Sequence, residues 1–156
     1  MSQYLLLKQG TIHNAVDEEA FVADILIEDG KIKKIAPVLE GKVINEAAVI
    51  DAMGIDVYPG FVDAHCHLGL DGYAVGFAGQ DFNELGDPVT PQLSAIDAIN
   101  PQDETFRMAR EGGVTCVSTG PGSSNVIGGT FCNIKTYGNR VDDMIVREKS
   151  AMKIAF

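Results

Sequence analysis

Residues 57–69, V-Y-P-G-F-V-D-A-H-C-H-L-G, decide how the rest of the chain is interpreted. An apolar, β-favouring run leads into two histidines one residue apart, and a glycine ends it. Because successive side chains of a strand point to opposite faces, we expect His65 and His67 to project together. The same alternation puts Asp63 on their face and Cys66 on the other. Two imidazoles on one face can bind a divalent cation, although a catalytic zinc takes three protein ligands and a water.

The His-x-His pair is a weak signal by itself, because two histidines near a strand end also fit one packed and one solvated imidazole. The preceding residues add to the signal, since 50–64 read I-D-A-M-G-I-D-V-Y-P-G-F-V-D-A. With the two histidines, this segment resembles the amidohydrolase superfamily, especially its imidazolonepropionase-like and related cyclic-amidohydrolase branches. The residues that fall at the family's spacing are Asp51, Gly54, Pro59, Gly60, Asp63, His65 and His67.

The resemblance implies an α/β fold in which a small β-sandwich part precedes a (β/α)8 TIM barrel. It implies that His65 and His67 bind the more buried of one or two divalent metal ions, with zinc as the first choice, and that Asp63 orients a ligand histidine. The metal would lower the pKa of a bound water to about 7, and this water would hydrolyse a cyclic amide, an amide or a peptide-like bond. The remaining ligands and the catalytic aspartate come from later strands in the family, so no catalytic residue is assigned in this chain.

The overall charge and composition narrow the choice of partners. The chain has 156 residues, and its 12 Lys and Arg against 22 Asp and Glu give a net charge of −10, which argues against nucleic acid or anionic membrane. No run approaches about 18 apolar residues and no basic segment precedes an apolar one at the start, so we expect a cytoplasmic protein. The three cysteines are expected to be reduced thiols. The expected partners are a small-molecule amide substrate and further copies of the chain, as a homo-oligomer.

Residues 1–57 are expected to form a small all-β unit. Asp29-Gly30 is a strong hairpin signal, because a type I′ turn needs positive φ at both central residues. Ile32 and Ile35 do not share a strand face, so the strand after this turn is expected to carry a bulge or to end early. The strands are expected at 4–12, 23–28, 31–36 and 47–51.

Residues 58–156 differ in character and are expected to form the first part of the barrel. The glycine-rich stretch 68–100 is expected to be an irregular loop that borders the pocket. A helix, a double-glycine stop and a β-branched run then follow, which is typical of a βαβ unit in a parallel sheet. The expected elements are a short helix within 90–100, a helix at 101–112 capped by Asn100, a strand at 131–137, a helix at 142–150, and barrel strands at 61–67, 114–119 and from 152 onward.

The segment S-S-N-V-I-G-G-T at 123–130 allows two interpretations. Its backbone N–H groups would suit an anion, although the Gly-Lys-Ser/Thr of a Walker loop is missing. The alternative is a turn-rich loop above a barrel strand, with no ligand of its own. The sequence favours the turn-rich loop.

The length of the chain leaves two further classes of protein open. A barrel takes about 250 residues, so we expect the N-terminal part of a longer enzyme. The chain would otherwise be a non-catalytic fragment that self-associates through an open sheet edge, because unpaired strands recruit partners. The histidines would also suit a β-barrel metal protein of the cupin kind. That class requires strands throughout, whereas 101–112 and 142–150 are expected to be helical.

Overall fold

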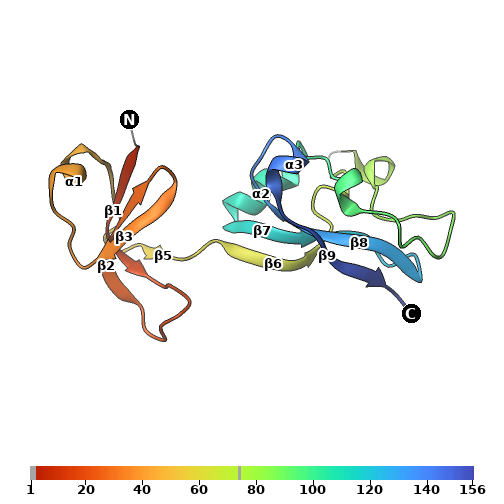
Figure 1. Ribbon diagram of the computed structural model, residues 1–156, viewed down its shortest axis with the longest axis horizontal. Helices are drawn as coiled ribbons and strands as arrows, with labels where there is room; N and C mark the ends of the chain where they lie inside the picture. The colour runs from red at the N-terminus through yellow and green to blue at the C-terminus, as the bar shows by residue number, and fades with distance from the viewer. Residues whose placement is uncertain (1–2, 74) are drawn as a thin grey trace. The chain divides into compact units, whose positions relative to one another are not determined.

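The computed structural model describes residues 3–73 and 75–156. The chain divides into two compact units, Met1–Pro59 and Gly60–Phe156, and each unit contains its own sheet (Figure 1). The two sheets contain both parallel and antiparallel pairs, and the helices are few and short. No helix among the described residues is long and apolar enough to cross a membrane.

The first unit is built on a five-stranded sheet. Strand β1 pairs antiparallel with β2 and parallel with β4 and β5, and β2 pairs antiparallel with β3. A single turn of helix, α1, means that the unit is β-rich and not all-β as expected. The bounds are β1 (Tyr4–Ile12), β2 (Phe21–Glu28), β3 (Lys31–Ala36), α1 (Lys42–Glu46), β4 (Ala48–Asp51) and β5 (Asp56–Val57).

The hairpin between β2 and β3 has the turn that the sequence predicts. Asp29 and Gly30 have φ of 50° and 77°, and a type I′ turn requires both to be positive. The predicted bulge is also present, because Leu26 pairs with Lys34 whereas Ile27 pairs with Ile32. β3 therefore contains one extra residue at this point. This bulge compensates for the interruption of the apolar alternation in the sequence of the strand.

The second unit contains a four-stranded sheet in the order β6-β7-β8-β9. β6 and β7 are parallel and are connected through α2, as the βαβ prediction requires, whereas β8 pairs antiparallel with both of its neighbours. A parallel pair joined by a helix contradicts the cupin-like alternative. The bounds are β6 (Phe61–Cys66), η1 (Gly76–Gly79), η2 (Ala95–Asp97), α2 (Glu104–Glu111), β7 (Val114–Thr119), β8 (Ile127–Lys135), α3 (Val141–Met144) and β9 (Ile145–Ile154).

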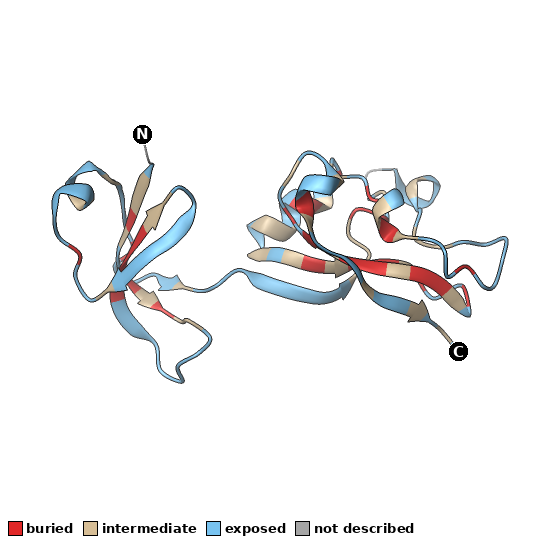
Figure 2. Ribbon diagram, viewed as in Figure 1, coloured by how far each residue is buried: buried red, intermediate tan, exposed pale blue. Residues whose placement is uncertain are grey.

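The core of the second unit lies between the sheet and the helices and loops that pack on it. Phe106 of α2 packs with Leu70 and Ile99 of the preceding loop against Val117 and Ile134 of the two central strands. Figure 2 shows the buried residues concentrated in β7 and β8, whereas β6 and β9 at the sheet edges are largely exposed. This packing fixes the carboxyl ends of β6 and β7 and the loops that leave them.

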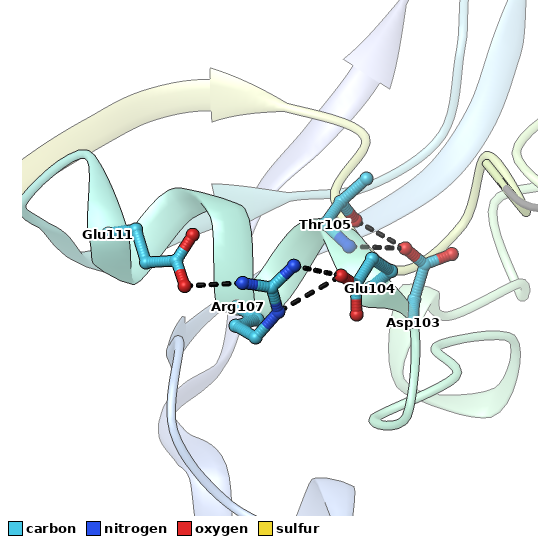
Figure 3. Close-up of polar contacts among 5 residues, drawn as sticks. All are labelled: Asp103, Glu104, Thr105, Arg107 and Glu111. Carbon is cyan, nitrogen blue, oxygen red and sulfur yellow. Dashed lines mark hydrogen bonds and ion pairs between the residues drawn. The ribbon is translucent and has the colours of Figure 1, made fainter.

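Helix α2 begins three residues later than the sequence predicts. Asn100 caps a turn, since its side chain accepts a hydrogen bond from the Gln102 N–H at 3.0 Å. The helix cap is Asp103, whose carboxylate accepts from the Thr105 N–H at 2.9 Å. Figure 3 shows this cap beside the ion pairs that Arg107 makes with Glu104 and Glu111 along the helix. The hydrogen bond from the Arg107 guanidinium holds the pKa of Glu104 below its usual value.

The predictions of a helix at 142–150 and of a separate strand from 152 are wrong. The helix α3 ends at Met144, and the next residues form β9. The strand pairs with β8 from Ile145, opposite Ile134, to Ile154, opposite Ile127. Hydrogen bonds to a neighbouring strand therefore outweigh the helical pattern, which is a weak local preference. The helix expected within 90–100 is likewise reduced to the single turn η2.

The glycine that ends α2 gives a test of this local structure. Gly113 has φ of +84°, where a side chain is strained, and a Cβ would approach Phe61 to 3.3 Å. We expect Gly113→Ala to lower the free energy of unfolding by about 1–2 kcal/mol. Gly112→Ala is the matched control, because φ is −81° there and a Cβ would make only ordinary contacts. Urea unfolding of both variants checks the difference, and equal effects would contradict it.

Candidate metal centre

The two histidines lie together at the carboxyl end of β6. Their rings are 5.4 Å apart between centroids and nearly perpendicular, with an interplanar angle of 80°. Strand alternation predicts this proximity, but β6 is not regular, because its register against β7 shifts between Asp63 and Cys66. The side chains therefore come together at an irregular strand end, a position where sheets often carry functional groups.

His67 is the more constrained of the two. Its Nδ1 is 2.6 Å from the carbonyl oxygen of Gly120, the residue after β7. A carbonyl can only accept, so Nδ1 carries the proton and Nε2 of the neutral ring keeps a free lone pair. The ring also stacks on Phe82, with centroids 5.0 Å apart and an interplanar angle of 16°. His67 is therefore held in the tautomer and orientation that a metal ligand requires.

His65 is exposed and is held less tightly. Its ring lies 5.2 Å from that of Phe131 on β8, and the described residues provide no hydrogen bond to its ring nitrogens. Asp63 acts on this residue through the main chain, because its carboxylate accepts a hydrogen bond from the His65 N–H at 3.1 Å. Of this pair, His67 has its ring nitrogen Nδ1 bound by Gly120 and not by Asp63, whose orienting role stays a prediction.

Cys66 differs from the two histidines in its surroundings. It is half-buried and packs against the core of the second unit. Burial is the largest of the effects that raise the pKa of its thiol, so the thiolate that a metal would require is disfavoured. The assignment of Cys66 to the opposite face therefore agrees with its packing.

The donor set is incomplete within this chain. Across residues 3–73 and 75–156, no three His, Cys, Asp or Glu side chains are grouped so that they could hold a metal ion. Two imidazole rings are suitable ligands for a divalent ion. The His67 ring is held in one orientation with its Nε2 lone pair free. A catalytic zinc takes three protein ligands, one more than this pair could offer.

Asn125 attaches the loop before β8 to the loop that carries Phe82. It is 3% exposed, and its amide donates to the carbonyls of Glu84 at 2.8 Å and Asp87 at 2.7 Å. The backbone of Gly122 also donates to the Phe82 carbonyl at 2.6 Å. Within the segment 123–130 the Asn125 side chain is thus used inside the protein, and β8 begins at Ile127, earlier than the strand expected at 131–137.

Three residues of this arrangement were not identified from the sequence. Gly120, Phe82 and Asn125 come from segments far from the histidines along the chain, and none has a motif of its own. The only signal was indirect, since the loops at 68–100 and 123–130 were both expected near the strand ends. Their contacts depend on how the two loops pack on each other.

No family model matches the chain, but individual proteins do. Amidohydrolase tasK of Hapsidospora irregularis is 35% identical over 123 residues, which are 78% of this chain and 12% of that protein. A dihydroorotase of Caldicellulosiruptor saccharolyticus is 42% identical over 69 residues, which are 44% of this chain and 16% of that protein. The D-hydantoinase of Geobacillus stearothermophilus is 46% identical over 67 residues, which are 42% of this chain and 13% of that protein.

The structure also resembles a solved one. The crystal structure of an amidohydrolase from Thermotoga maritima MSB8 aligns with 97% of this chain at a TM-score of 0.89 and 39% identity, and the alignment covers 39% of that protein. The chain belongs to the amidohydrolase superfamily, as the resemblance in residues 50–67 predicts, and it spans only part of the relatives that it matches.

Asn125 allows a test of the contact between the two loops. Replacing it by Ala leaves two carbonyls in the loop without their donors, so we expect Asn125→Ala to lower the free energy of unfolding by about 2–3 kcal/mol. Ser124→Ala, at an exposed neighbouring position, should change it by less than about 0.5 kcal/mol. Urea unfolding measures both. A small effect of Asn125→Ala would show that the loops are held by other contacts.

Proposed function

We propose that the chain is the N-terminal, metal-binding part of an amidohydrolase that cleaves C–N bonds of cyclic amides or related amides with a metal-activated water. The observation that carries this proposal is the His67 ring, whose Nδ1–H is held by Gly120 while Nε2 stays free beside His65. The relatives named dihydroorotase and D-hydantoinase support the cyclic-amide class. Zinc is the ion that this donor set suits first.

Each residue of the site has a role in this proposal. When bound, the metal would supply an activated water and polarise the substrate carbonyl. His67 would contribute Nε2, and Phe82 shields one face of its ring from water. His65 would contribute the second nitrogen from the exposed side, where a substrate can approach. Asp63 would hold the backbone of His65 in place through its carboxylate.

We further propose that β6 and β7 are the first two strands of a (β/α)8 barrel in the complete protein. The parallel pairing through α2 supports this, as does the position of the histidines at the carboxyl end of β6, since barrel enzymes carry their chemistry at that end. The antiparallel strands β8 and β9 are additions to the simple barrel plan.

Self-association is a second candidate function for the chain by itself. Strand β6 is at the edge of its sheet, and Val62 within it is 70% exposed. Edge strands of this kind recruit other strands. Sedimentation should then show a dimer that forms with rising protein concentration. A monomer at every concentration would exclude this candidate.

The metal assignment has a direct test. We expect the double variant His65→Ala, His67→Ala to lose bound zinc without unfolding, because both side chains lie at a strand end outside the buried core. Elemental analysis and circular dichroism measure the two properties. His13→Ala is the control, since His13 belongs to the first unit and pairs with Asp56 at 2.8 Å. Zinc content unchanged in the double variant would refute the assignment.

The 156 residues alone should show no hydrolase activity. Two imidazoles leave a zinc ion short of the three protein ligands of catalytic sites. The zinc-saturated chain, assayed against cyclic amides, N-acyl amino acids and dipeptides, should give background rates. Zinc-dependent turnover that disappears in His65→Ala would show that no further strands are needed.

A further inference from the structure

One buried aromatic side chain contacts both histidines of the pair. Phe131 of β8 is 4% exposed, and its ring centroid is 5.2 Å from that of His65 and 6.5 Å from that of His67. Both separations lie in the range of aromatic contacts. We propose that Phe131 is a positioning residue of the metal centre, which fixes where the two imidazoles lie relative to each other. The proposal rests on the proposed function and names a residue that metal binding would require.

The surroundings of Phe131 carry the first step. The buried residues Cys132 and Ile134 of the same strand belong to the core of the second unit. Phe131 is buried as well, but it belongs to none of the three apolar clusters found in the described part of the chain. Its aromatic contacts among the described residues are with His65 and His67. The contacts of this large apolar side chain therefore include the candidate site and not the apolar core.

Gly120 connects Phe131 to the orientation of His67. A Cβ placed on Gly120 would lie 2.4 Å from Cγ of Phe131, so the ring packs directly on the main chain there. The carbonyl of the same glycine lies 2.6 Å from Nδ1 of His67, and its N–H donates to the carbonyl of Cys66 at 3.3 Å. Phe131 thus acts on His67 in two ways, through the imidazole ring itself and through the residue that holds the Nδ1 proton.

The position of His65 depends more strongly on Phe131. The ring nitrogens of His65 have no hydrogen bond among the described residues, so packing is what limits the rotation of this ring. Phe82 stacks on His67, whereas Phe131 contacts both rings. A metal ion needs the two imidazoles in place at the same time. A side chain that holds both before the metal arrives reduces the entropy that binding would otherwise cost.

The test replaces Phe131 by Leu, which keeps an apolar side chain and removes the flat ring. We expect zinc to bind about tenfold more weakly, the smaller of the losses typical of residues that support a metal ligand. Calorimetric titration of the folded chain with zinc measures this affinity. In the zinc-free, 15N-labelled variant, the ring nitrogens of His67 should move toward the averaged shifts of two exchanging tautomers, because Gly120 is no longer held against the ring.

Ile134→Val is the matched control, because it removes apolar volume from the same strand at a residue buried in the core. It should lower the urea midpoint about as much as Phe131→Leu does. Its zinc affinity and the nitrogen shifts of His67 should stay unchanged. A residue that serves stability alone would affect the urea midpoint and not these two readouts.

Gly120→Ala tests the same contact from its other side and serves if Phe131→Leu does not fold. The added methyl group would collide with the Phe131 ring, so we expect zinc affinity to fall by about tenfold here as well. Gly128→Ala is its control, since a Cβ there would make only ordinary contacts, the shortest at 3.4 Å. The zinc affinity of Gly128→Ala should equal that of the unsubstituted chain.

The positioning role would be overturned by unchanged zinc affinity or unchanged His67 nitrogen shifts in Phe131→Leu, or by equal losses in Ile134→Val. The proposed function fails by a different result, the absence of zinc binding in the unsubstituted chain. The nitrogen shifts of the zinc-free variants would then still show whether Phe131 places the His67 ring.

Discussion

The hydrogen bond from the His67 ring to the Gly120 carbonyl is the constraint on which the site depends. It joins the residue after β6 to the residue after β7, so it depends on the parallel pairing of these two strands. The pairing in turn needs α2 to return the chain to the start of β7, with Phe106 buried against the sheet. The chemistry proposed for one nitrogen atom is thus supported by the whole βαβ unit.

The same unit explains how the loops serve the site. Leu70 and Ile99 anchor both ends of the long loop in the core, and Asn125 fixes its middle to the segment before β8. Phe82, between these anchors, has a fixed place against His67.

The features of the fold that depend on interactions between neighbouring residues could be predicted from the sequence. The turn at Asp29-Gly30 and the strands around it follow from backbone preference and alternation, and both match the structure. The helix expected at 142–150 failed because β8 supplies backbone partners to Ile145–Ile154, which no short window of sequence reveals. The histidine pair could be identified from spacing and family resemblance. Its partner Gly120 could not, because a backbone carbonyl leaves no trace in residue type.

The central claim is that His67 offers Nε2 to a metal because Nδ1 is held by Gly120. Nitrogen-15 NMR of the imidazole rings in the zinc-free chain tests it most directly, since the two tautomers give different nitrogen shifts. The account predicts that His67 is protonated at Nδ1 and that added zinc shifts the Nε2 resonance. A ring protonated at Nε2, or a zinc-induced shift confined to Nδ1, would contradict it.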